Sequence, residues 1–573
     1  MATSRRKLLE QIGGAGASLG VVSLAGCFSG GEDTDLGNRE ATADLPSEAR
    51  VEEMTHYTTT EAYWSERFHA VQLVDQRLTE HLGLPVEPKG LELSAWPEYQ
   101  TEGRFGFWSS NWSSGDGDPD SQLMDTFTTD AGSNYWRYSN EEYDEIAREQ
   151  RRATDPDERQ ELVYEAQRIL GEERPESQIV YNYRTHAINN ERIDEDSVVL
   201  NFMGIRNIWN LVSMEPLNDE GRTIVTNNFD PTDSLNPLHQ NTVEALRNVW
   251  GVELTHDYLY QTDPEMNPQP WAAEGHDWVD ETTIDVQLRS DLVAHDGESI
   301  TAEDVVFTFD LILETEPPIY TNIVNTVVDT VEQRGDYEVR FVLGEPYAPF
   351  ITSTLGRVPI LPKHYWEEIM ADTGNEDTPW EISFIDRDLV ASGPFIKGRW
   401  EQGERLEFDA FEDHPFAAPN IDKRIERNLA SRDAEINALE SGEYDTFETW
   451  FGSPSDLNEL AEENEHISMV KHLTDTRMAM WSQCERKPLD DVAVRQAVNT
   501  VVMATQQEII SEIFDDIADP AYSPISPSLE FWHNPDTPVF EGGPEAAVEL
   551  LTDAGYRWDE SGHLHLPEGE TVN

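Results

Sequence analysis

Residues 282–313 read TTIDVQLRSDLVAHDGESITAEDVVFTFDLIL, and they begin with a predicted strand and a tight turn. Ile284, Val286 and Leu288 alternate with polar residues at the two-residue period of a strand. Asp296-Gly297 then supplies a turn whose glycine can adopt a positive φ. This order of signals predicts a strand that leads through a turn into a second element.

The second element is predicted to be a helix, from a capping pattern at its start and from the spacing of its apolar residues. Thr301 and Asp304 form a capping-box pattern. Val305, Phe309 and Ile312 follow at the three- and four-residue spacing of one helical face. Taken alone, these residues predict an ordinary αβ unit.

The wording of this unit resembles the signature "LR…v.F.dG.p.tA.DV.f" of family 5 extracellular solute-binding proteins, the peptide and nickel receptors of ABC importers. Other stretches resemble the same family in its own order. They are GRTIVTNNFDPTDSLNPL at 221–238, PILPKHYWEE at 359–368, SGPFIKGRWEQGERLEF at 392–408 and PEAAVELLTDAGY at 544–556. The resemblance implies an α/β fold of two lobes, similar to type II periplasmic binding proteins, with an extra α+β domain.

The segments that resemble the closing third of the family stand at the front of this chain. They are FGFWSSNWSSGDGDPDSQLMDTF at 105–127, a helix from Pro156, and the strand SQIVYNYRTHAIN. Circular permutation is the simplest account, with residues 51–215 completing a lobe that 478–573 begins. The alternative is a truncated receptor fused to an unrelated domain. Permutation predicts that Asn573 lies near Glu48 to Thr55, that 64–180 pack with 489–555, and that 222–240 pack with 391–450.

The resemblance divides the chain into seven parts. These are a twin-arginine lipoprotein signal (1–26), an acidic tether (27–50), a ligand-binding lobe (51–180 and 478–573), a core lobe (181–275 and 391–477) and an extra family-specific domain (276–390).

Composition indicates a folded and very acidic protein. The chain has 573 residues, of which 38% are hydrophobic and 10% aromatic, enough for two or three domains with sizeable cores. Its formal net charge of -73 excludes nucleic acid as a partner. Lysine is scarce, so the pattern resembles proteins of extreme halophiles, in which molar salt screens the repulsion between carboxylates.

The N-terminus resembles a twin-arginine lipoprotein signal. Arg5-Arg6 precedes a short apolar run rich in glycine and alanine that ends in Leu24-Ala25-Gly26-Cys27. On this interpretation Cys27 carries the lipid, although an uncleaved anchor is an alternative. The other cysteine is Cys484, so no intrachain disulfide is expected.

The aromatic segment is the first candidate for the binding site, because a solute site needs apolar faces and a few fixed polar groups. Trp108, Trp112, Asp116 and Asp118 offer both. In dipeptide receptors of the family a carboxylate of this loop pairs with the ligand's amine, but the matching position here is Gly115. Solvated acids beside a core tryptophan are the alternative.

The aspartates of this segment also resemble the start of a calcium-binding loop. Asp116, Asp118 and Asp120 match its start, but Ser121 and Phe127 stand at the positions of its glycine and glutamate, which argues against a metal.

Three more residues are candidates through the resemblance. Trp450 and Trp481 fall where the family brings strand ends and loops to its cleft, and a place in the core is the alternative for each. Asn236, in the stretch that resembles the "sLnP" loop, is included as a ligand-binding residue, although a structural role fits it better.

No catalytic or cofactor motif accompanies these features. Gly16-Ala17-Ser18-Leu19-Gly20 matches a nucleophile elbow but lies in the signal segment, and the histidines lack metal-ligand spacing. The resemblance therefore implies a monomeric receptor without enzymatic activity, metal or cofactor. It would be lipid-anchored on the extracytoplasmic face of the membrane, bind a small solute, first of all a peptide, and deliver it to the transmembrane subunits of an ABC permease. An oligosaccharide receptor, a receptor that acts only in signalling, and an exported hydrolase are the alternatives.

Overall fold

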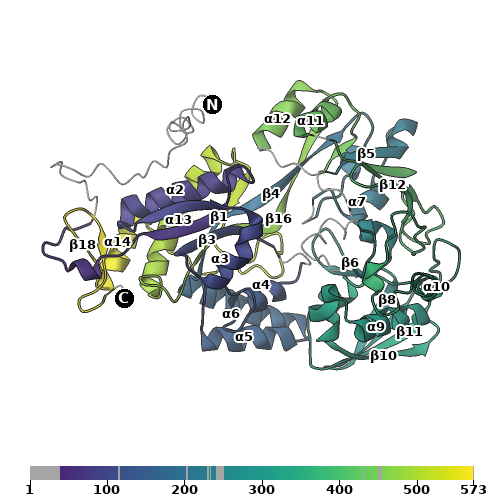
Figure 1. Cartoon of the computed structure of the whole chain (residues 1–573), viewed down its shortest axis with the longest axis horizontal. Helices are drawn as coiled ribbons and strands as arrows, with labels where there is room; N and C mark the ends of the chain where they lie inside the picture. The colour runs from purple at the N-terminus through teal and green to yellow at the C-terminus, as the bar shows by residue number, and fades with distance from the viewer. Residues whose placement is uncertain are drawn as a thin grey trace.

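The computed structural model describes residues 39–113, 117–201, 204–228, 232, 234–239, 251–429, 431–448 and 454–571. Cys27, Asp116 and Trp450 lie outside these ranges. The chain forms two lobes joined by two long strands (Figure 1). Lobe 1 comprises residues 39–181 and 477–571, and lobe 2 comprises residues 183–473.

Lobe 1 places helices on both faces of its strands. Its elements are η1 (Ser47–Ala49), β1 (Met54–Thr59), α2 (Ser65–Leu82), β2 (Val86–Leu91), η2 (Leu93–Ala95), α3 (Trp96–Glu102), β3 (Phe107–Trp112), α4 (Asp120–Phe127), α5 (Glu141–Arg152), α6 (Pro156–Glu173), α13 (Val492–Glu512), β17 (Ala518–Pro520), α14 (Gly543–Asp553), β18 (Arg557–Trp558) and β19 (Leu564–His565). The strands that cross into lobe 2 are β4 (Glu176–Asn189) and β16 (Ile467–Ser482).

Lobe 2 holds the remaining strands and a second sheet. Its elements are η3 (Glu195–Ser197), α7 (Ile208–Ser213), η4 (Asp219–Arg222), β5 (Thr223–Asn227), β6 (Tyr260–Thr262), β7 (Pro268–Pro270), β8 (Ala273–Asp280), β9 (Thr283–Leu288), α9 (Ala302–Thr315), η5 (Pro318–Tyr320), η6 (Thr321–Asn325), β10 (Val328–Gly335), β11 (Glu338–Leu343), η7 (Phe350–Leu355), α10 (Lys363–Thr373), η8 (Pro379–Glu381), β12 (Phe395–Glu401), β13 (Arg405–Ala410), β14 (Lys423–Arg427), α11 (Arg432–Glu440), β15 (Thr446–Phe447) and α12 (Pro454–Glu463).

One large sheet runs through both lobes. Its strand order is β12-β13-β14-β5-β15-β4-β16-β3-β1-β2, and β17 also pairs with β4. β4 and β16 are antiparallel neighbours along most of their length. Because the described chain passes between the lobes only in these two strands, they form a natural hinge.

The stretch at 282–313 folds as its sequence predicts. Strand β9 buries Ile284 and Val286, both with 0% exposure. Gly297 adopts a φ of +91°. Thr301 and Asp304 complete both hydrogen bonds of the capping box at the start of α9. This unit packs in the second sheet, of order β10-β11-β9-β8.

The predicted extra domain at 276–390 shares its hydrophobic core with the rest of lobe 2. Ile284 and Phe341 of the second sheet belong to the same buried cluster as Ile224, Phe395 and Phe408 of the large sheet. The second sheet and the core strands therefore form one packed body.

Lobe 1 is assembled from the two ends of the chain. Val74 and Leu78 of α2 and Val498 and Val501 of α13 lie in one cluster with 0% exposure. This shared core is the packing that the sequence predicts for residues 64–180 and 489–555. The pairing of β5 with β14 and β15 likewise joins 222–240 to 391–450.

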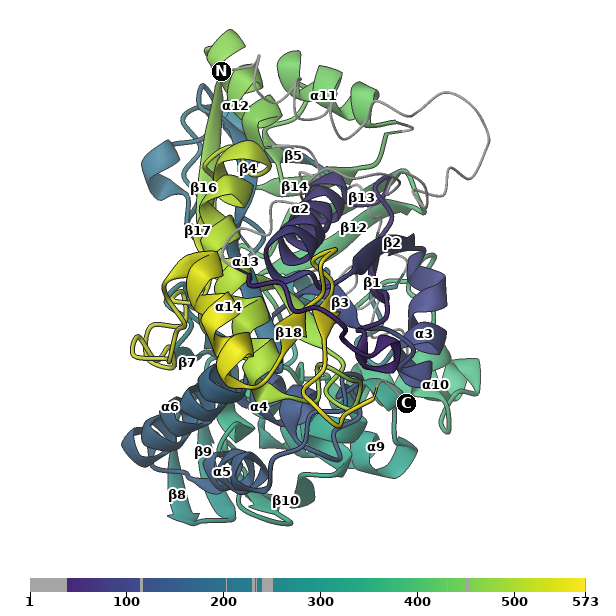
Figure 2. The ribbon, with the colours of Figure 1, turned by 90° about the vertical axis from the view of Figure 1, so that its left-hand side faces the viewer.

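The two ends are also hydrogen-bonded to each other. The Val51 N–H donates to the Leu564 carbonyl at 2.9 Å, and the Leu566 N–H donates to the Ala49 carbonyl at 2.8 Å. Figure 2 shows the purple N-terminal segment beside yellow β18. Asn573 lies outside the described residues, so its predicted position stays a prediction.

Candidate functional site

Three polar side chains share one face of the hinge strand β4. Asn182, Arg184 and His186 share this face because side chains alternate along a strand. The Asn111 side-chain amide of lobe 1 donates to Asn182 Oδ1 at 2.9 Å. At the other end, His186 contacts lobe 2. Arg184 therefore lies midway between a lobe 1 contact and a lobe 2 contact.

His186 is fixed by lobe 2 through both ring nitrogens. Its Nδ1 lies 2.8 Å from the Glu448 carbonyl, to which it can only donate, and its Nε2 accepts the Ile205 N–H at 3.4 Å. Burial, followed by the positive charge of Arg184, lowers the pKa of His186 to about 4. The imidazole is therefore neutral at physiological pH.

Arg184 is the one residue of β4 that the strand leaves exposed. Even so, crowding by protein atoms lowers the pKa of Arg184, Asp475 raises it, and Arg206 lowers it further. Asp475, on β16, accepts a hydrogen bond from the Ser113 hydroxyl at 2.7 Å.

A buried ionic cluster forms the lobe 2 wall next to the hinge. Arg424 on β14 donates to both carboxylate oxygens of Glu448 at 2.6 Å and to Glu426 at 3.1 Å. Burial alone would raise the pKa of Glu448, but Arg424 outweighs it and the pKa is lowered. Arg206 lies 3.9 Å from Glu448. Arg424 and Glu426 lie on β14 and Glu448 directly follows β15, so the cluster joins the two strands that flank β5.

The predicted tryptophans lie at different depths in lobe 1. Trp108 is 1% exposed and packs edge-on against Trp96, with ring centroids 5.0 Å apart. Trp481, also 1% exposed, stacks on Trp136 at 4.8 Å. Both belong to one aromatic core, which covers the faces that a solute would stack on. Trp112 is only half-buried and contacts Trp481 edge-on at 6.3 Å.

Asp118 is held by an arginine. Arg159 donates to both carboxylate oxygens of Asp118, at 2.5 and 2.8 Å, and both side chains are buried. The following acid of the predicted calcium-like run, Asp120, is paired in the same way with Arg151 at 2.6 and 3.0 Å. Among the described residues, no group of three or more His, Cys, Asp or Glu could hold a metal ion.

Asn236 has a structural position. Its amide donates to the carbonyls of Pro379 and Ile382, both at 2.9 Å, and its Oδ1 accepts the Leu238 N–H at 2.9 Å. The side chain is 2% exposed, and these bonds tie the loop to η8. The amide of Asn236 is therefore fully engaged within lobe 2.

The lobes also touch away from the hinge. The Thr352 hydroxyl of lobe 2 donates to Asp118 at 3.2 Å, and the Ala348 N–H donates to the Arg151 carbonyl at 2.7 Å. Gly117 adopts a φ of +81°, and a Cβ there would lie 2.7 Å from the Met266 side chain. Glycine thus permits this close approach of the lobes.

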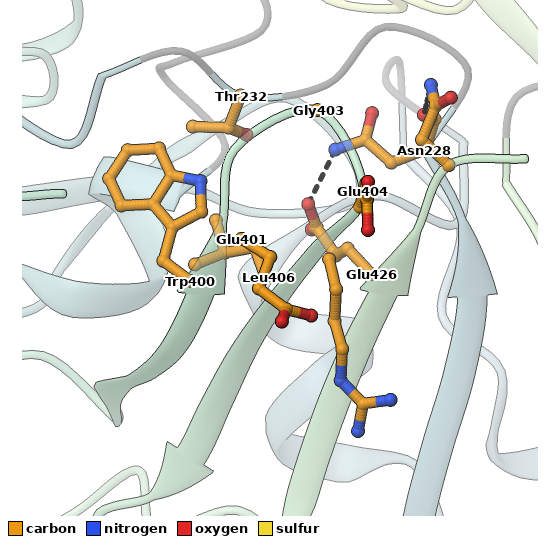
Figure 3. Close-up of a pocket in the computed structure, with 10 residues that line it drawn as sticks. Asn228, Thr232, Trp400, Glu401, Gly403, Glu404, Leu406 and Glu426 are labelled. Carbon is orange, nitrogen blue, oxygen red and sulfur yellow. Dashed lines mark hydrogen bonds between the residues drawn. The ribbon is translucent and has the colours of Figure 1, made fainter.

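A small pocket opens on lobe 2 at the end of the sheet (Figure 3). Trp400 forms one side of it, and Asn228, which donates to Glu426 at 2.6 Å, forms the other. Its free volume of about 10 Å³ accommodates one water molecule. The pocket is therefore too small for a solute the size of a peptide.

The site residues that the sequence predictions missed are Arg184 and the Arg424 cluster. A signal for Arg184 exists, since Asn182, Arg184 and His186 alternate with Tyr181, Tyr183 and Thr185 in the expected strand. For Arg424 and Glu426 the same alternation is present, but their partner Glu448 follows at a distance that no local pattern reveals.

Two further observations concern Cys484 and the helices. Cys484 is a free thiol, and burial raises its pKa to about 11, so it is a poor nucleophile. No helix among the described residues is long and apolar enough to cross a membrane.

Comparison with known proteins identifies relatives. The sequence model of "Bacterial extracellular solute-binding proteins, family 5 Middle" matches residues 267–572. The oligopeptide-binding protein AppA of Bacillus subtilis is 27% identical over 308 residues, which cover 53% of this chain and 54% of AppA. The dipeptide-binding protein of Escherichia coli K12 is 24% identical over 294 residues, 48% of this chain and 52% of the relative. The chain thus spans about half the length of these relatives.

A solved structure is similar to part of this chain. The structure of B. subtilis AppA in complex with a nonapeptide is 21% identical, with a TM-score of 0.42, and the match covers 61% of this chain and 67% of that chain. The family match covers more than half of this chain, and it fits the mixed α/β architecture with two lobes. The protein therefore belongs to the family 5 extracellular solute-binding proteins.

Proposed function

We propose that this protein is the receptor of an ABC importer, which captures dipeptides or oligopeptides outside the cell and delivers them to a membrane permease. The observation that carries the proposal is the family match over residues 267–572. Peptide is the favoured class because the relatives named above are described as oligopeptide- and dipeptide-binding proteins.

The hinge explains how such a receptor would act. A solute that contacts both lobes stabilises the closed arrangement by its extra affinity for that state. Closure changes the backbone mainly where β4 and β16 cross between the lobes, and the ladder is already irregular there, between Leu473 and Arg477. No bond in the solute is made or broken.

The proposed solute contacts come from lobe 1 and the hinge. Trp112 supplies an apolar face that is still partly accessible, and Asp116 supplies a carboxylate on the loop that follows. Trp108 and Trp481 support this face from the core, and Asp118 stays a candidate through its place at the interlobe contact. Trp450 stays a candidate on the resemblance alone.

The test is equilibrium binding of a library of short peptides to the purified protein in molar salt. We expect saturable retention of peptides with one solute per protein. Retention of oligosaccharides instead of peptides would mean that the solute is a sugar. Hydrolysis of the peptide library would contradict the proposal that the protein is a receptor.

We further propose that the chain is a circularly permuted member of the family. The shared core of α2 and α13 and the hydrogen bonds between residues 49–51 and 564–566 support this order. A gene that encodes residues 222–571, a flexible linker and then residues 39–215 should yield a protein with unchanged melting and binding. If residues 39–215 instead fold alone with their own cooperative transition, the chain is a fusion.

The anchor and the salt adaptation are proposed from the sequence. Lipidation at Cys27 after twin-arginine export would hold the monomeric receptor on the extracytoplasmic face of the membrane. In that case Cys27→Ser should move the protein from the membrane fraction to the medium. The same distribution for both proteins would argue for an uncleaved anchor or for none.

A further inference from the structure

The tip of the β6–β7 hairpin reaches from lobe 2 to the core of lobe 1. Met266, at this tip, is only 6% exposed, although its neighbours Glu265 and Asn267 are exposed. It belongs to the aromatic core cluster whose other buried members, such as Trp108 and Trp481, come from lobe 1. Side chains of the opposite lobe therefore cover Met266.

The hairpin tip holds Met266 in this position through its own hydrogen bonds. The Asp263 carbonyl accepts the Met266 N–H at 2.9 Å, and Asp263 Oδ1 accepts the Asn267 N–H at 2.8 Å. Gln269 donates to the other carboxylate oxygen of Asp263 at 2.9 Å. Met266 itself has a φ of +68°, a left-handed conformation that is unfavourable for a residue other than glycine. The fold thus maintains a strained residue at the point where the lobes meet.

The loop of lobe 1 that receives Met266 is held in place and leaves room for it. Gly117 has no side chain, and a Cβ at this position would lie 2.7 Å from Met266 Cε. The next residue, Asp118, is fixed by the buried Arg159, which donates to both of its carboxylate oxygens. Any side chain at position 117 would displace Met266, so glycine preserves the contact.

A second contact between the lobes lies at the end of α5. Arg151 is in the last turn of this helix, where carbonyls lack a partner within the helix, and its carbonyl accepts the Ala348 N–H of lobe 2 at 2.7 Å. Its guanidinium carbon lies 5.9 Å from the centre of the Tyr347 ring. The adjacent ion pair of Arg152 and Glu345 is exposed on both sides, so it contributes little, least of all in molar salt. The apolar and backbone contacts therefore contribute most to this interface.

We infer that the insertion of Met266 beside Gly117 is a latch, which holds the two lobes together without touching the solute and so sets the affinity for every solute alike. The lobes are joined by two hinge strands, and a contact made only when they meet favours the closed arrangement. A larger closed fraction lowers the apparent Kd of each solute by the same factor. The effect on binding rests on the proposed receptor function, whereas the effect on the lobes does not.

The experiment measures lobe closure and solute binding separately, on the full-length protein in molar salt. Small-angle neutron scattering of protein freed of solute by exhaustive dialysis reports how far the lobes open. Calorimetry with several unrelated peptides reports affinity. Met266→Ala should enlarge the radius of gyration and weaken the binding of every peptide by the same factor, at least about fivefold, because a truncated buried side chain loses its packing.

Two further variants separate the latch from general stability. Met266→Leu keeps the volume of the side chain and should behave as wild type in both measurements. Met370→Ala is the matched control, because Met370 is 7% exposed and packs within lobe 2. It should lower the melting temperature and keep the scattering and the affinities of wild type.

Four other outcomes would count against the inference or against the peptide class. Wild-type scattering and affinity in Met266→Ala would overturn the latch and leave the receptor standing. Weaker binding of only some peptides would also overturn it, because Met266 would then contact the solute. The same changes in Met370→Ala as in Met266→Ala would show a loss of general stability and overturn it too. If the wild-type protein binds no peptide, the peptide class fails, and scattering alone decides whether the latch exists.

Discussion

Thr352 in lobe 2 donates a hydrogen bond to Asp118 in lobe 1, with 3.2 Å between the two oxygens. The carboxylate that receives it is also clamped by Arg159 within its own lobe. Asp118 is thus both the ion-pair partner of Arg159 and the acceptor of a hydrogen bond from the other lobe. The two roles can be separated by changing one partner at a time.

Asp118→Asn should destabilise lobe 1, because it leaves the buried Arg159 guanidinium without its anion. The expected loss is about 3 to 5 kcal/mol of unfolding free energy, measured by chemical denaturation in molar salt. Thr352→Val removes the contact between the lobes and the contact of the same hydroxyl with the Pro349 carbonyl at 3.1 Å, so it should leave stability within about 1 kcal/mol and weaken solute binding slightly. Equal destabilisation by both changes would show that Asp118 stabilises the fold mainly through lobe contact.

Trp112→Ala should weaken solute binding by at least about fivefold, because truncating a stacked tryptophan costs about 1 kcal/mol or more. Trp278→Ala, which removes another half-buried ring on β8, is the control for general effects of losing a tryptophan. Trp481→Ala should act differently, by lowering stability about 3 to 5 kcal/mol through a core cavity. Calorimetry that finds the same affinity for Trp112→Ala and wild type would remove this ring from the site.

His186 should make the fold sensitive to acid. Its pKa is lowered to about 4 by burial and then by Arg184, whereas an unfolded histidine titrates near 6.5. Between these values the unfolded chain binds the proton and the folded chain does not, so this group disfavours folding progressively as pH falls from about 6.5 to about 4.

The size of that effect is about 3 kcal/mol. His186→Gln, which can still donate and accept hydrogen bonds, lacks the titration. The stability advantage of wild type over the variant should therefore shrink by that amount across the interval, measured by urea denaturation at fixed high salt. Parallel curves for the two proteins would mean that His186 titrates normally in the folded state.

The stability of the folded protein should increase with salt concentration. The net charge of -73 produces repulsion that molar salt screens within a Debye length of roughly 3 Å. Circular dichroism should show a cooperative transition in about 3 M salt and a much lower midpoint in about 0.1 M salt. Equal midpoints in the two conditions would contradict the halophilic interpretation.

The local structure was predictable because caps and apolar faces act over a few residues. Thr301 and Asp304 cap α9, and Gly297 takes the positive φ of the turn before it, as the sequence indicates. Resemblance to the family supplied what local patterns could not, namely that distant segments such as α2 and α13 share a core.

The depth of the site residues was not predictable. Trp108 and Trp112 are four residues apart on β3, so the alternation of a strand places both on one face. The same alternation does not tell how far each side chain lies from solvent. Trp96 and Phe105 cover Trp108, and nothing equivalent in the core covers Trp112 as fully. The burial of each tryptophan therefore depends on which side chains from other elements pack over it. Likewise the pairing of Asp118 with Arg159 joins residues 41 positions apart, which no spacing rule anticipates.

The central claim is that the two lobes close on a peptide, and the solute that copurifies with the protein tests it most directly. The full chain would be purified in molar salt, denatured, and its released small molecules identified by mass spectrometry. The account predicts short peptides, up to one per protein, and markedly less of them from Trp112→Ala. Recovery of a sugar or another non-peptide solute at that ratio, with equal amounts from the wild type and from Trp112→Ala, would contradict it.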